Sequence, residues 1–516
     1  MLVFEMRYRN RLITCIKDGM LPHFSNMKSL FYIVIFSLLS SVSQASPWLD
    51  SGDNRLRHHI QLLADKNIIT VPVTTWPLMW SDVIRDVSAV KPAQLDEQSF
   101  WSLRYVNHAF DRQSAEDVRL NASLALGNEV NALKGFSDNR REKAETKASI
   151  DWQGERLAFQ LAATHADNSL GGNTLRADGS FISYRLGNWA LTAGAIDRWW
   201  GPGWHSTLTL SNNARPIPAL SLQRRNSDAF KLRGLSWLGP WQFVTMMGQL
   251  ESNRHIPDAY FLAARVNFKP TANLEIALSR TAQWGGEGRP QNWSSLKGLI
   301  IGDDNRGSGN VALDASNEPG NQQGSIDMRY HFSLARAVNA IYFQFTGEDE
   351  ANGLPSRGMV QLGVESRFLY RDIQHHLILE ATDTRSEAYS EKRFNYAYEH
   401  GIYKTGYRYK QRPIGASIDN DSQYVTIGMD HYLVNGQQLS WSLSRAEINT
   451  DRVNVKAPSG SVFGRGADTD IVKVSYHFPF GKKWQASLGL QYMTEKIIFN
   501  NEALGSNASL TLDYRY

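Results

Sequence analysis

Apolar and polar residues alternate one by one over most of this chain, and the C-terminus shows the pattern most plainly. One face of the last segment is entirely apolar, with Ala508, Leu510, Leu512, Tyr514 and Tyr516. The other face carries Ser509, Thr511, Asp513 and Arg515. The same period of two begins at Val118 and recurs over 118–126, 181–186, 377–382, 439–444 and 487–492. It predicts β-strands with one apolar and one polar face, and at about ten residues per strand we expect roughly twenty of them.

The connections between these strands form two classes that alternate along the chain. Short ones lie at Lys269-Pro270, Arg371-Asp372, Glu399-His400-Gly401, Asn435-Gly436 and Pro479-Phe480-Gly481-Lys482. Long polar ones lie at about 285–322, 348–357, 384–390, 411–421, 449–468 and 496–504. A soluble β-sandwich has no reason to sort its loops in this way. A transmembrane barrel does, because it has short periplasmic turns on one rim, long external loops on the other and an even number of strands.

Aromatic residues gather at the ends of the strand candidates. They include Tyr330, Phe332, Tyr342, Phe343, Phe368, Tyr370, Tyr407, Tyr409, Tyr476 and Phe478. Aromatic girdles at the two membrane interfaces have this distribution. A mean hydropathy of −0.39 and 21% charged residues exclude a helical membrane bundle. They are compatible with a barrel whose lumen and loops are polar.

Residues 48–112 follow a helical period instead. The first helix candidate begins near Asp53, a residue type that caps helices. Three apolar stripes at helical spacing follow, made of Leu56, Ile60 and Leu63, then Val83, Ile84 and Val87, then Phe100, Leu103, Val106 and Phe110. They predict a small packed bundle rather than a ligand site.

The N-terminus indicates export. Lys28 precedes the apolar run 30–39, and small residues follow up to Ser43-Gln44-Ala45, which is the layout of a cleaved signal peptide. The run is short for a spanning helix, although an uncleaved anchor is the alternative. We expect translation to start at Met27, so that residues 1–26 are not part of the protein. The predicted parts are a signal peptide at 1–45, a periplasmic helical bundle at 46–115 and an outer-membrane β-barrel at 116–516.

The leader also accounts for the basic balance of the chain. It holds five of the 55 basic and two of the 51 acidic side chains, so the remainder is nearly neutral. A nearly neutral protein offers no case for nucleic-acid binding. The only cysteine, Cys15, lies in the leader, which excludes disulfides, thiol catalysis and cysteine metal sites from the mature protein.

The sequence contains no convincing catalytic or metal-binding pattern. His375-His376 lies in a strand candidate, where neighbouring side chains face opposite sides and cannot easily share a ligand. Asp303-Asp304-Asn305 lies in a glycine-rich loop, but no glutamate follows at the spacing of a calcium loop. There is also no serine elbow and no metal-spaced histidine pair. We therefore predict that the protein is not an enzyme and binds no metal or cofactor.

One segment has the composition of a sugar-binding site. The strand 189–197 runs outward and a strand near 229–237 runs inward, so 198–227 is predicted to be a long external or lumen-folded loop, with room for a strand pair. Its candidate polysaccharide-binding residues are Trp199, Trp200, Trp204, His205, Asn212, Asn213 and Arg215. Indole rings stack on sugar rings, and amides and guanidinium groups bind hydroxyls. The alternative is that glycine and proline fold the loop while the tryptophans plug the lumen or mark the membrane interface.

At these residues the chain resembles the Wzi family of outer-membrane capsule-assembly proteins. The blocks that carry the resemblance are Ser46-Pro47-Trp48, Gly52-Asp53-Asn54-Arg55-Leu56-Arg57, Thr75-Trp76-Pro77-Leu78, Trp199-Trp200-Gly201-Pro202-Gly203-Trp204, Leu210-Ser211-Asn212-Asn213-Ala214-Arg215-Pro216-Ile217-Pro218, Gly406-Tyr407-Arg408-Tyr409 and Gly415-Ala416. They span nearly the whole mature chain. The resemblance implies an all-β transmembrane antiparallel barrel of eighteen strands with a periplasmic helical bundle. We then expect the surplus pair of strand candidates to lie in the N-terminal half, outside the barrel.

The function that the resemblance implies is that of a lectin of the outer membrane, which holds capsular polysaccharide or exopolysaccharide at the cell surface. We expect it to act as a monomer surrounded by outer-membrane lipids. The alternative is a diffusion channel, because a barrel of this size conducts if its lumen is open. The helical bundle and the tryptophan loop are placed to close the two mouths.

Overall fold

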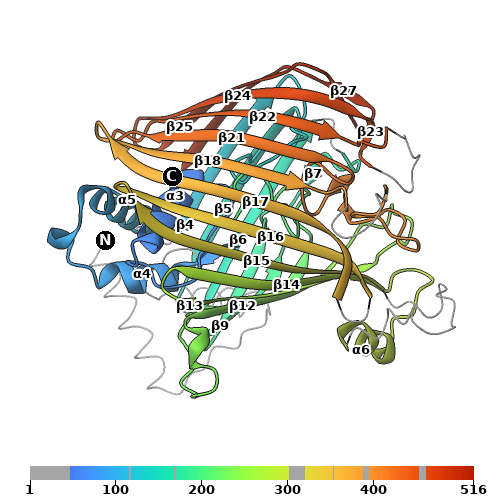
Figure 1. The fold of residues 1–516 in the computed structure, drawn as a ribbon, viewed down its shortest axis with the longest axis horizontal. Helices are drawn as coiled ribbons and strands as arrows, with labels where there is room; N and C mark the ends of the chain where they lie inside the picture. Colours follow the sequence, from blue (N-terminus) through green and yellow to red (C-terminus); the bar gives the residue numbers. More distant parts are fainter. Residues whose placement is uncertain are drawn as a thin grey trace, which may run out of the picture. The chain divides into compact units, whose positions relative to one another are not determined.

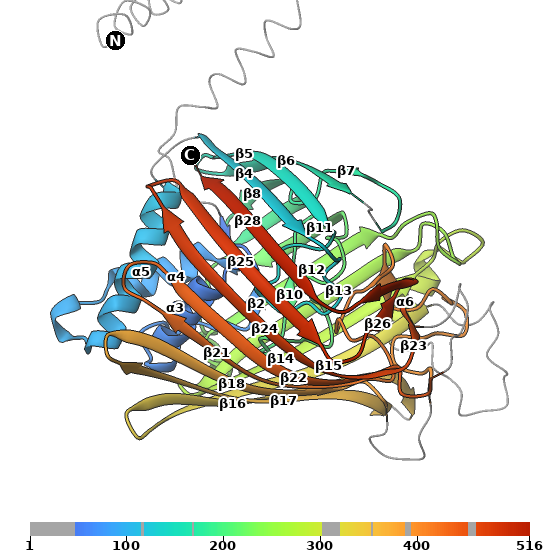
Figure 2. The same cartoon turned by 90° about the horizontal axis from the view of Figure 1, so that it is seen from above.

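The computed structural model describes residues 47–114, 118–167, 170–301, 320–351, 354–386, 394–452 and 461–515, which belong to one compact unit (Figures 1 and 2). The predicted signal peptide and Asp303-Asp304-Asn305 lie outside this part of the chain. Among the residues described, no helix is both long and apolar enough to cross a membrane.

The helical part, residues 47–114, contains three α-helices. They are α3 (Asn54–Asp65), α4 (Trp80–Ser88) and α5 (Glu97–Ser114), with a 3₁₀ turn η1 (Pro92–Gln94). Asp53 caps α3 as predicted, because its Oδ1 accepts the Leu56 N–H at 2.9 Å. The predicted apolar stripes share one core, with Ile60 and Val106 fully buried. Two short strands, β1 (Trp48–Leu49) and β3 (Leu78–Met79), pair with each other.

The rest of the described chain forms a closed antiparallel barrel, which confirms the predicted fold class. Its strands are β4 (Val118–Gly127), β5 (Ala144–Gln153), β6 (Leu157–Asp167), β7 (Leu175–Arg176), β8 (Phe181–Leu186), β9 (Trp189–Gly194), β11 (Ala219–Arg224), β12 (Trp241–Gln249), β13 (Tyr260–Thr271), β14 (Leu274–Trp284), β15 (Gly320–Leu334), β16 (Ala337–Ala351), β17 (Leu354–Tyr370), β18 (Ile373–Asp383), β21 (Gln423–Tyr432), β22 (Gln438–Ile448), β24 (Ala467–Phe480), β25 (Trp484–Met493) and β28 (Asn507–Arg515). Because β7 and β8 both pair with β6, they form one interrupted strand and the described barrel has eighteen. The last strand, β28, pairs with β25 on one side and with β4 on the other, which closes the barrel (Figure 2).

The distribution of side chains is the reverse of that in a soluble protein. Leu443 and Leu490 are 49% and 65% exposed on the outer wall, whereas Glu365 and Arg367 are almost fully buried in the lumen. Soluble proteins rarely place charges inside and large apolar residues outside. A barrel whose outer wall faces lipid needs this arrangement.

The two rims differ as the loop lengths predicted. The helical part lies at one rim (Figure 1), where short turns such as Ala335–Arg336 and Arg371–Asp372 join the strands. Both residues of each of these turns have positive φ, between 50° and 64°, and this turn geometry matches the twist of a two-residue hairpin. Most long connections lie at the opposite rim, but the sixteen-residue β11–β12 connection lies on the helix side. One connection of the opposite rim forms α6 (Trp293–Ile301), which packs on the outer wall at Trp284. The predicted long connection at 348–357 is wrong, because β16 extends to Ala351 and β17 begins at Leu354.

Two predicted strand positions are wrong. Residues 229–237 are not a strand but part of the β11–β12 connection, which contains the 3₁₀ turn η2 (Ser236–Leu238). The strand that follows the tryptophan loop is β11 (Ala219–Arg224), so the predicted loop bounds of 198–227 extend too far. The predicted tight turn at Glu399-His400-Gly401 is also absent, because residues 384–422 form one long connection between β18 and β21. It contains the small hairpin β19 (Arg408–Tyr409) and β20 (Arg412–Pro413). The surplus strand pair therefore lies in the C-terminal half, not in the N-terminal half.

Candidate functional site

The segment between β9 and β11, residues 195–218, enters the barrel and is called the lumenal segment below. Its first strand, β10 (Trp199–Trp200), pairs antiparallel with β2 (Thr75–Trp76) of the helical part. Trp76, Trp199 and Trp200 are among the largest fully buried side chains of the described chain. The helical part and the lumenal segment therefore share one packed interior.

Two of the three tryptophans of the predicted site, Trp199 and Trp204, hold this segment in place through hydrogen bonds. The Trp199 indole N–H donates to the carbonyl of Gly203 at 3.0 Å. The Trp204 indole N–H donates to Glu365 Oε2 on β17 at 2.7 Å, and its backbone N–H donates to Glu380 Oε2 on β18 at 2.7 Å. A Cβ atom at position 203 would lie 2.2 Å from the Ser206 carbonyl oxygen. That close approach explains the glycine in the block that ends at Trp204.

The other predicted site residues connect neighbouring segments. Asn212 Nδ2 donates to the Phe136 carbonyl and Asn213 Nδ2 to the Pro413 carbonyl, each at 2.9 Å. Arg215 donates two hydrogen bonds to Asp178, at 2.8 and 2.9 Å. The His205 backbone donates to Glu380, and burial lowers the pKa of its imidazole, so that the neutral form is favoured.

The structure places the seven residues in the lumen, which is the lumen-folded form of the predicted loop and not the external one. Trp199 and Trp200 are 0% exposed, and Trp204 is 3% exposed. The burial excludes an external loop and favours the alternative in which the tryptophans plug the lumen. Contact of these residues with sugar stays a prediction.

Helix α3 binds the lumenal segment through a buried arginine. Arg57 donates to the carbonyls of Gly203 at 2.9 Å and Pro202 at 2.7 Å. Its guanidinium carbon lies 4.0 Å from the centre of the Trp204 ring. Burial lowers the pKa of Arg57 to about 9, and the charged form is compensated by these carbonyls and by the aromatic face. The N-terminal block that contains Arg57 and the tryptophan block thus make one structural unit.

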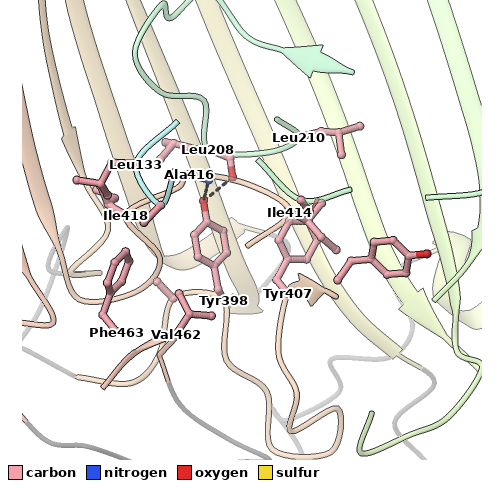
Figure 3. Close-up of a cluster of buried hydrophobic side chains, with 14 of the residues drawn as sticks. Leu133, Leu208, Leu210, Tyr398, Tyr407, Ile414, Ala416, Ile418, Val462 and Phe463 are labelled. Carbon is pink, nitrogen blue, oxygen red and sulfur yellow. Dashed lines mark hydrogen bonds between the residues drawn. The ribbon is translucent and has the colours of Figure 1, made fainter. Parts of the chain in front are cut away.

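Residues 394–422, called the lid segment below, cover the lumenal segment at the rim opposite the helices. Figure 3 shows the Tyr398 hydroxyl between two chain segments. It donates to the Leu208 carbonyl at 2.6 Å and accepts the Ala416 N–H at 2.9 Å. The Tyr407 hydroxyl donates to the Thr209 carbonyl at 2.8 Å. The predicted places of Tyr407 and Tyr409 in an aromatic girdle are wrong, because both are buried in this core. Tyr342 is not a girdle residue either, since it is 3% exposed and its hydroxyl donates to Glu380 Oε2 at 2.7 Å.

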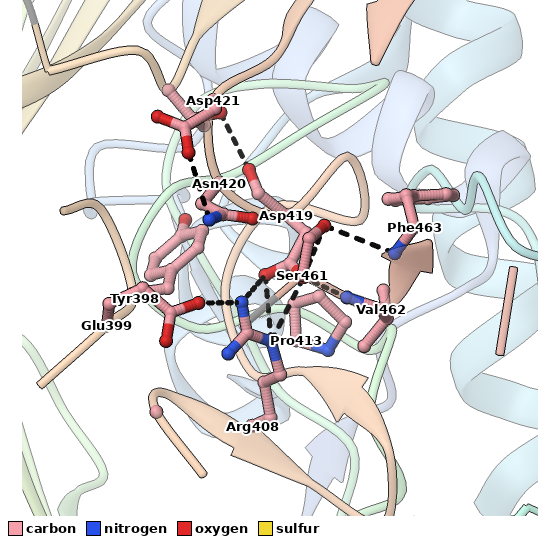
Figure 4. A network of polar contacts seen from close by, with 12 residues as sticks. Tyr398, Glu399, Arg408, Pro413, Asp419, Asn420, Asp421, Ser461, Val462 and Phe463 are labelled. Atoms are coloured by element: carbon pink, nitrogen blue, oxygen red, sulfur yellow. Dashed lines mark hydrogen bonds and ion pairs between the residues drawn. The ribbon is translucent and has the colours of Figure 1, made fainter. Parts of the chain in front are cut away.

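Ion pairs within the lid segment stabilise its fold (Figure 4). Arg408 Nε lies 3.0 Å from Asp419 Oδ2, and its Nη2 donates to Glu399 Oε1 at 2.6 Å. These two carboxylates raise the pKa of Arg408, although burial opposes the shift. Asp419 also accepts the Val462 N–H at 2.8 Å, which joins the lid segment to the connection between β22 and β24.

Further hydrogen bonds tie the lid segment to loops around the rim. Arg412 donates to the carbonyls of Asn131 and Arg141, between β4 and β5. Arg254, between β12 and β13, donates to the Arg408 carbonyl at 3.1 Å, and Tyr403 donates to the Gly285 carbonyl after β14 at 3.1 Å. The lid segment is therefore a fixed cover and not a free loop.

Replacing Tyr398 with phenylalanine is expected to lower the free energy of unfolding by about 1–3 kcal/mol, because a buried carbonyl and a buried N–H lose their partner. Denaturant titration of the protein in detergent measures this change. Tyr492→Phe is the matched control, since Tyr492 is 57% exposed on the outer wall. Equal stability of the two variants would show that the hydroxyl of Tyr398 does not fasten the lid segment.

Sequence reasoning missed the surface of the lid segment. Phe394 is 40% exposed, and Lys404 is exposed on the same segment. The sequence predicts a tight turn at Glu399-His400-Gly401 in this region, and therefore a strand on each side of it. The positive φ of Lys410 and Gln411, at 49° and 61°, marks the hairpin that breaks this pattern.

The structure supports the expected separation of the adjacent histidines. His376 faces the lumen, where its Nε2 lies 2.9 Å from Glu365 Oε2. His375 faces the outer wall, where its Nδ1 lies 2.7 Å from His431 Nδ1. Within the described ranges, no group of three or more histidine, cysteine, aspartate and glutamate side chains is arranged to hold a metal ion.

Known proteins resemble this chain over most of its length. The model of the family described as "Capsule assembly protein Wzi" matches residues 126–512. A protein of Klebsiella pneumoniae, described as an uncharacterized 55.8 kDa protein in the cps region, is 30% identical over 422 residues, which is 81% of each chain. The solved structure of Wzi from Escherichia coli, described as an outer-membrane protein involved in group 1 capsule assembly and a carbohydrate-binding β-barrel, has a TM-score of 0.78 and 24% identity. It covers 90% of this chain and 99% of that chain.

Proposed function

Because the chain belongs to the capsule assembly protein Wzi family, we propose that it is an outer-membrane protein that attaches or organises capsular polysaccharide or exopolysaccharide at the cell surface. The helix-side rim then faces the periplasm and the lid segment faces outward. The protein acts as a monomer in outer-membrane lipids, without a catalytic step.

The fixed lid segment is the observation that carries this proposal. A channel needs an open path, whereas here the lumenal segment packs inside the lumen and the lid segment is hydrogen-bonded to loops on several sides. Such a cover offers a rigid surface to an external ligand, and a rigid surface loses little conformational entropy on binding. The lumenal tryptophans support this surface from below, which gives them an indirect role.

We place the sugar-binding surface on the exposed side of the lid segment. Phe394 offers an apolar ring for stacking, and Lys404 offers a cation for hydroxyl or acidic groups of a polysaccharide. Replacing either residue with alanine should weaken polysaccharide binding about three- to tenfold, the equivalent of about 0.7–1.4 kcal/mol. Binding of purified polysaccharide to the immobilised protein and retention of polysaccharide on cells are the two readouts.

Lys482→Ala is the control variant, because Lys482 is exposed in the β24–β25 turn on the helix-side rim. It should bind and retain polysaccharide as the unmodified chain does. If Phe394→Ala and Lys404→Ala match this control in both readouts, the sugar-binding surface is not on the lid segment.

One observation favours the diffusion channel as a second candidate. A cavity of about 760 Å³ remains between the helical part and the inner wall at β4, β25 and β28. Hydroxyl and amide side chains such as Ser123, Gln491 and Thr511 line it. Single-channel recording separates the two functions, since a large steady conductance would support a channel and its absence a binding protein.

A further inference from the structure

The β11–β12 connection, residues 225–240, differs from the other turns of the helix-side rim. Short turns join the other described strand pairs there, for example two residues between β17 and β18. The β11–β12 connection has sixteen residues and contains η2. Its middle part, residues 229–238, is called the tip below.

The base of this connection is fastened to helix α4. The Ser227 N–H donates to Asp82 Oδ1 at 2.7 Å, and the Ser227 hydroxyl donates to Asp82 Oδ2 at 2.5 Å. Arg85, on the same helix, donates to Asp228 Oδ1 at 2.9 Å. Asp82 is fully buried. The connection therefore leaves the rim in a fixed direction.

The tip lies against the outer wall of the barrel and not over its mouth. Phe230 stacks on Trp241 with ring centres 4.5 Å apart and an angle of 9° between the rings. Trp237 contacts Phe268 edge to face, with ring centres 6.1 Å apart. Trp241 and Phe268 are directly paired across β12 and β13. Because their neighbour Gln242 is buried in the lumen, both rings point outward.

The surface of the tip combines large apolar and basic side chains. Leu232 and Trp237 are 67% and 61% exposed, and Leu235 is 38% exposed. Lys231 and Arg233 are exposed beside them. A loop surrounded by water gains nothing from three exposed apolar residues, whereas tryptophan, leucine and lysine or arginine together are typical of membrane interfaces. The apolar surface continues the lipid-facing wall, and the two cations complement anionic headgroups.

We propose that the tip is an interfacial anchor that binds the anionic phospholipid leaflet at the helix-side rim. Phe230 and Trp237 rest on the barrel wall, Leu232 and Leu235 enter the acyl region, and Lys231 and Arg233 contact the phosphates. The inference goes beyond polysaccharide binding, but it rests on the proposed placement of the barrel in a membrane.

Site-directed labelling tests the anchor in the full chain. The only cysteine, Cys15, lies in the predicted leader, so a single introduced cysteine places one label at a chosen position of the mature chain. We compare an environment-sensitive fluorophore at Leu235→Cys with the same label at Leu443→Cys on the outer wall and at Asn435→Cys in the exposed β21–β22 turn. The protein is reconstituted in vesicles of phosphatidylcholine and phosphatidylglycerol that contain spin-labelled lipid as the quencher.

We expect the label at 235 to be quenched about as strongly as that at 443, while the label at 435 is quenched severalfold less. If the labels at 235 and 435 behave alike, the tip does not enter the membrane and the anchor is overturned. If the label at 443 is not quenched either, the outer wall does not face lipid and the membrane placement itself fails. The label at 235 could also report an apolar environment that depends on protein concentration and not on spin-labelled lipid. That result would show that the tip contacts another protein molecule, and it would overturn the anchor.

The two basic residues are tested by exchanging the quencher. Spin-labelled phosphatidylglycerol should quench the label at 235 severalfold more efficiently than spin-labelled phosphatidylcholine does. In the double variant Lys231→Gln/Arg233→Gln, the two spin-labelled lipids should quench the label with equal efficiency, and the label should still be quenched. Equal efficiencies before the substitution would overturn the binding of anionic lipid.

Discussion

Replacing Asp65 with alanine is expected to lower the free energy of unfolding by about 3–5 kcal/mol, the usual cost of removing one partner of a buried ion pair. Asp65 is the last residue of α3 and is 4% exposed. It accepts hydrogen bonds from Arg329 on β15 at 2.5 and 2.7 Å and from Arg367 on β17 at 3.0 Å. Both arginines also contact Glu365. Without Asp65, the two buried cations share that carboxylate, and α3 loses its ion pairs with β15 and β17.

The next residue provides the control for this prediction. Lys66 pairs with Asp96 at 2.5 Å, but the Asp96 side chain is 59% exposed, and such surface pairs contribute at most about 1 kcal/mol. Denaturant titration should therefore separate Asp65→Ala from Lys66→Ala, and limited proteolysis should cut the helical part only in the first variant. If both variants have the same free energy of unfolding as the unmodified chain, this buried network does not stabilise the helical part.

The barrel could be predicted from sequence because its signals are local. Alternation along 508–516 and turn pairs such as Arg371-Asp372 are read within a few residues, and they are enough to indicate strands, their outer faces and the sorting of the rims. The apolar stripes of the helical part are local signals of the same kind. The network around Asp65 is not local, since its partners at 329, 365 and 367 are about 300 residues away in the sequence.

The candidate site could be predicted only in part, for the same reason. Tryptophan, glycine and asparagine blocks marked residues 199–215 as a special segment, but composition does not distinguish a ring that stacks on sugar from one that packs on Arg57. In the lid segment, Tyr407 has the pattern of a strand end, yet a hydrogen bond to Thr209, almost 200 residues earlier, places it inside the lumen. Whether a segment faces lumen, lipid or water depends on contacts that alternation does not encode.

A dependence of stability on pH is expected at Asp421, which is buried in the lid segment just before β21. Burial, together with the charges of Asp451, Asp419 and Glu399, raises its pKa from an ordinary value of 3.8 to about 7. Between these two values the folded chain holds a proton that the unfolded chain has released. The free energy of unfolding therefore falls as the pH rises from about 4 to 7, and the loss is complete above pH 7.

Replacing Asp421 with asparagine removes this charge but keeps an oxygen for the Asn395 N–H, which lies 2.7 Å from Asp421 Oδ2. At pH 8 the variant should be more stable than the unmodified chain by about 2–4 kcal/mol, because each tenfold change in a protonation equilibrium corresponds to about 1.4 kcal/mol. Near pH 4 the variant and the unmodified chain should have the same free energy of unfolding. Denaturant titrations across this pH range measure the difference.

The same substitution two residues earlier should have the opposite sign. Asp419 pairs with Arg408 at 2.9 Å and accepts the Val462 N–H, so Asp419→Asn leaves a buried guanidinium with less compensation and destabilises the lid segment at pH 8. A gain in stability at pH 8 for Asp421→Asn and a loss for Asp419→Asn would show that two ionised carboxylates have opposite effects. That of Asp419 stabilises the lid segment, and that of Asp421 destabilises it. A loss for both would mean that Asp421 is ionised and paired in the folded chain, so that the lid segment is most stable above pH 7 and not below it.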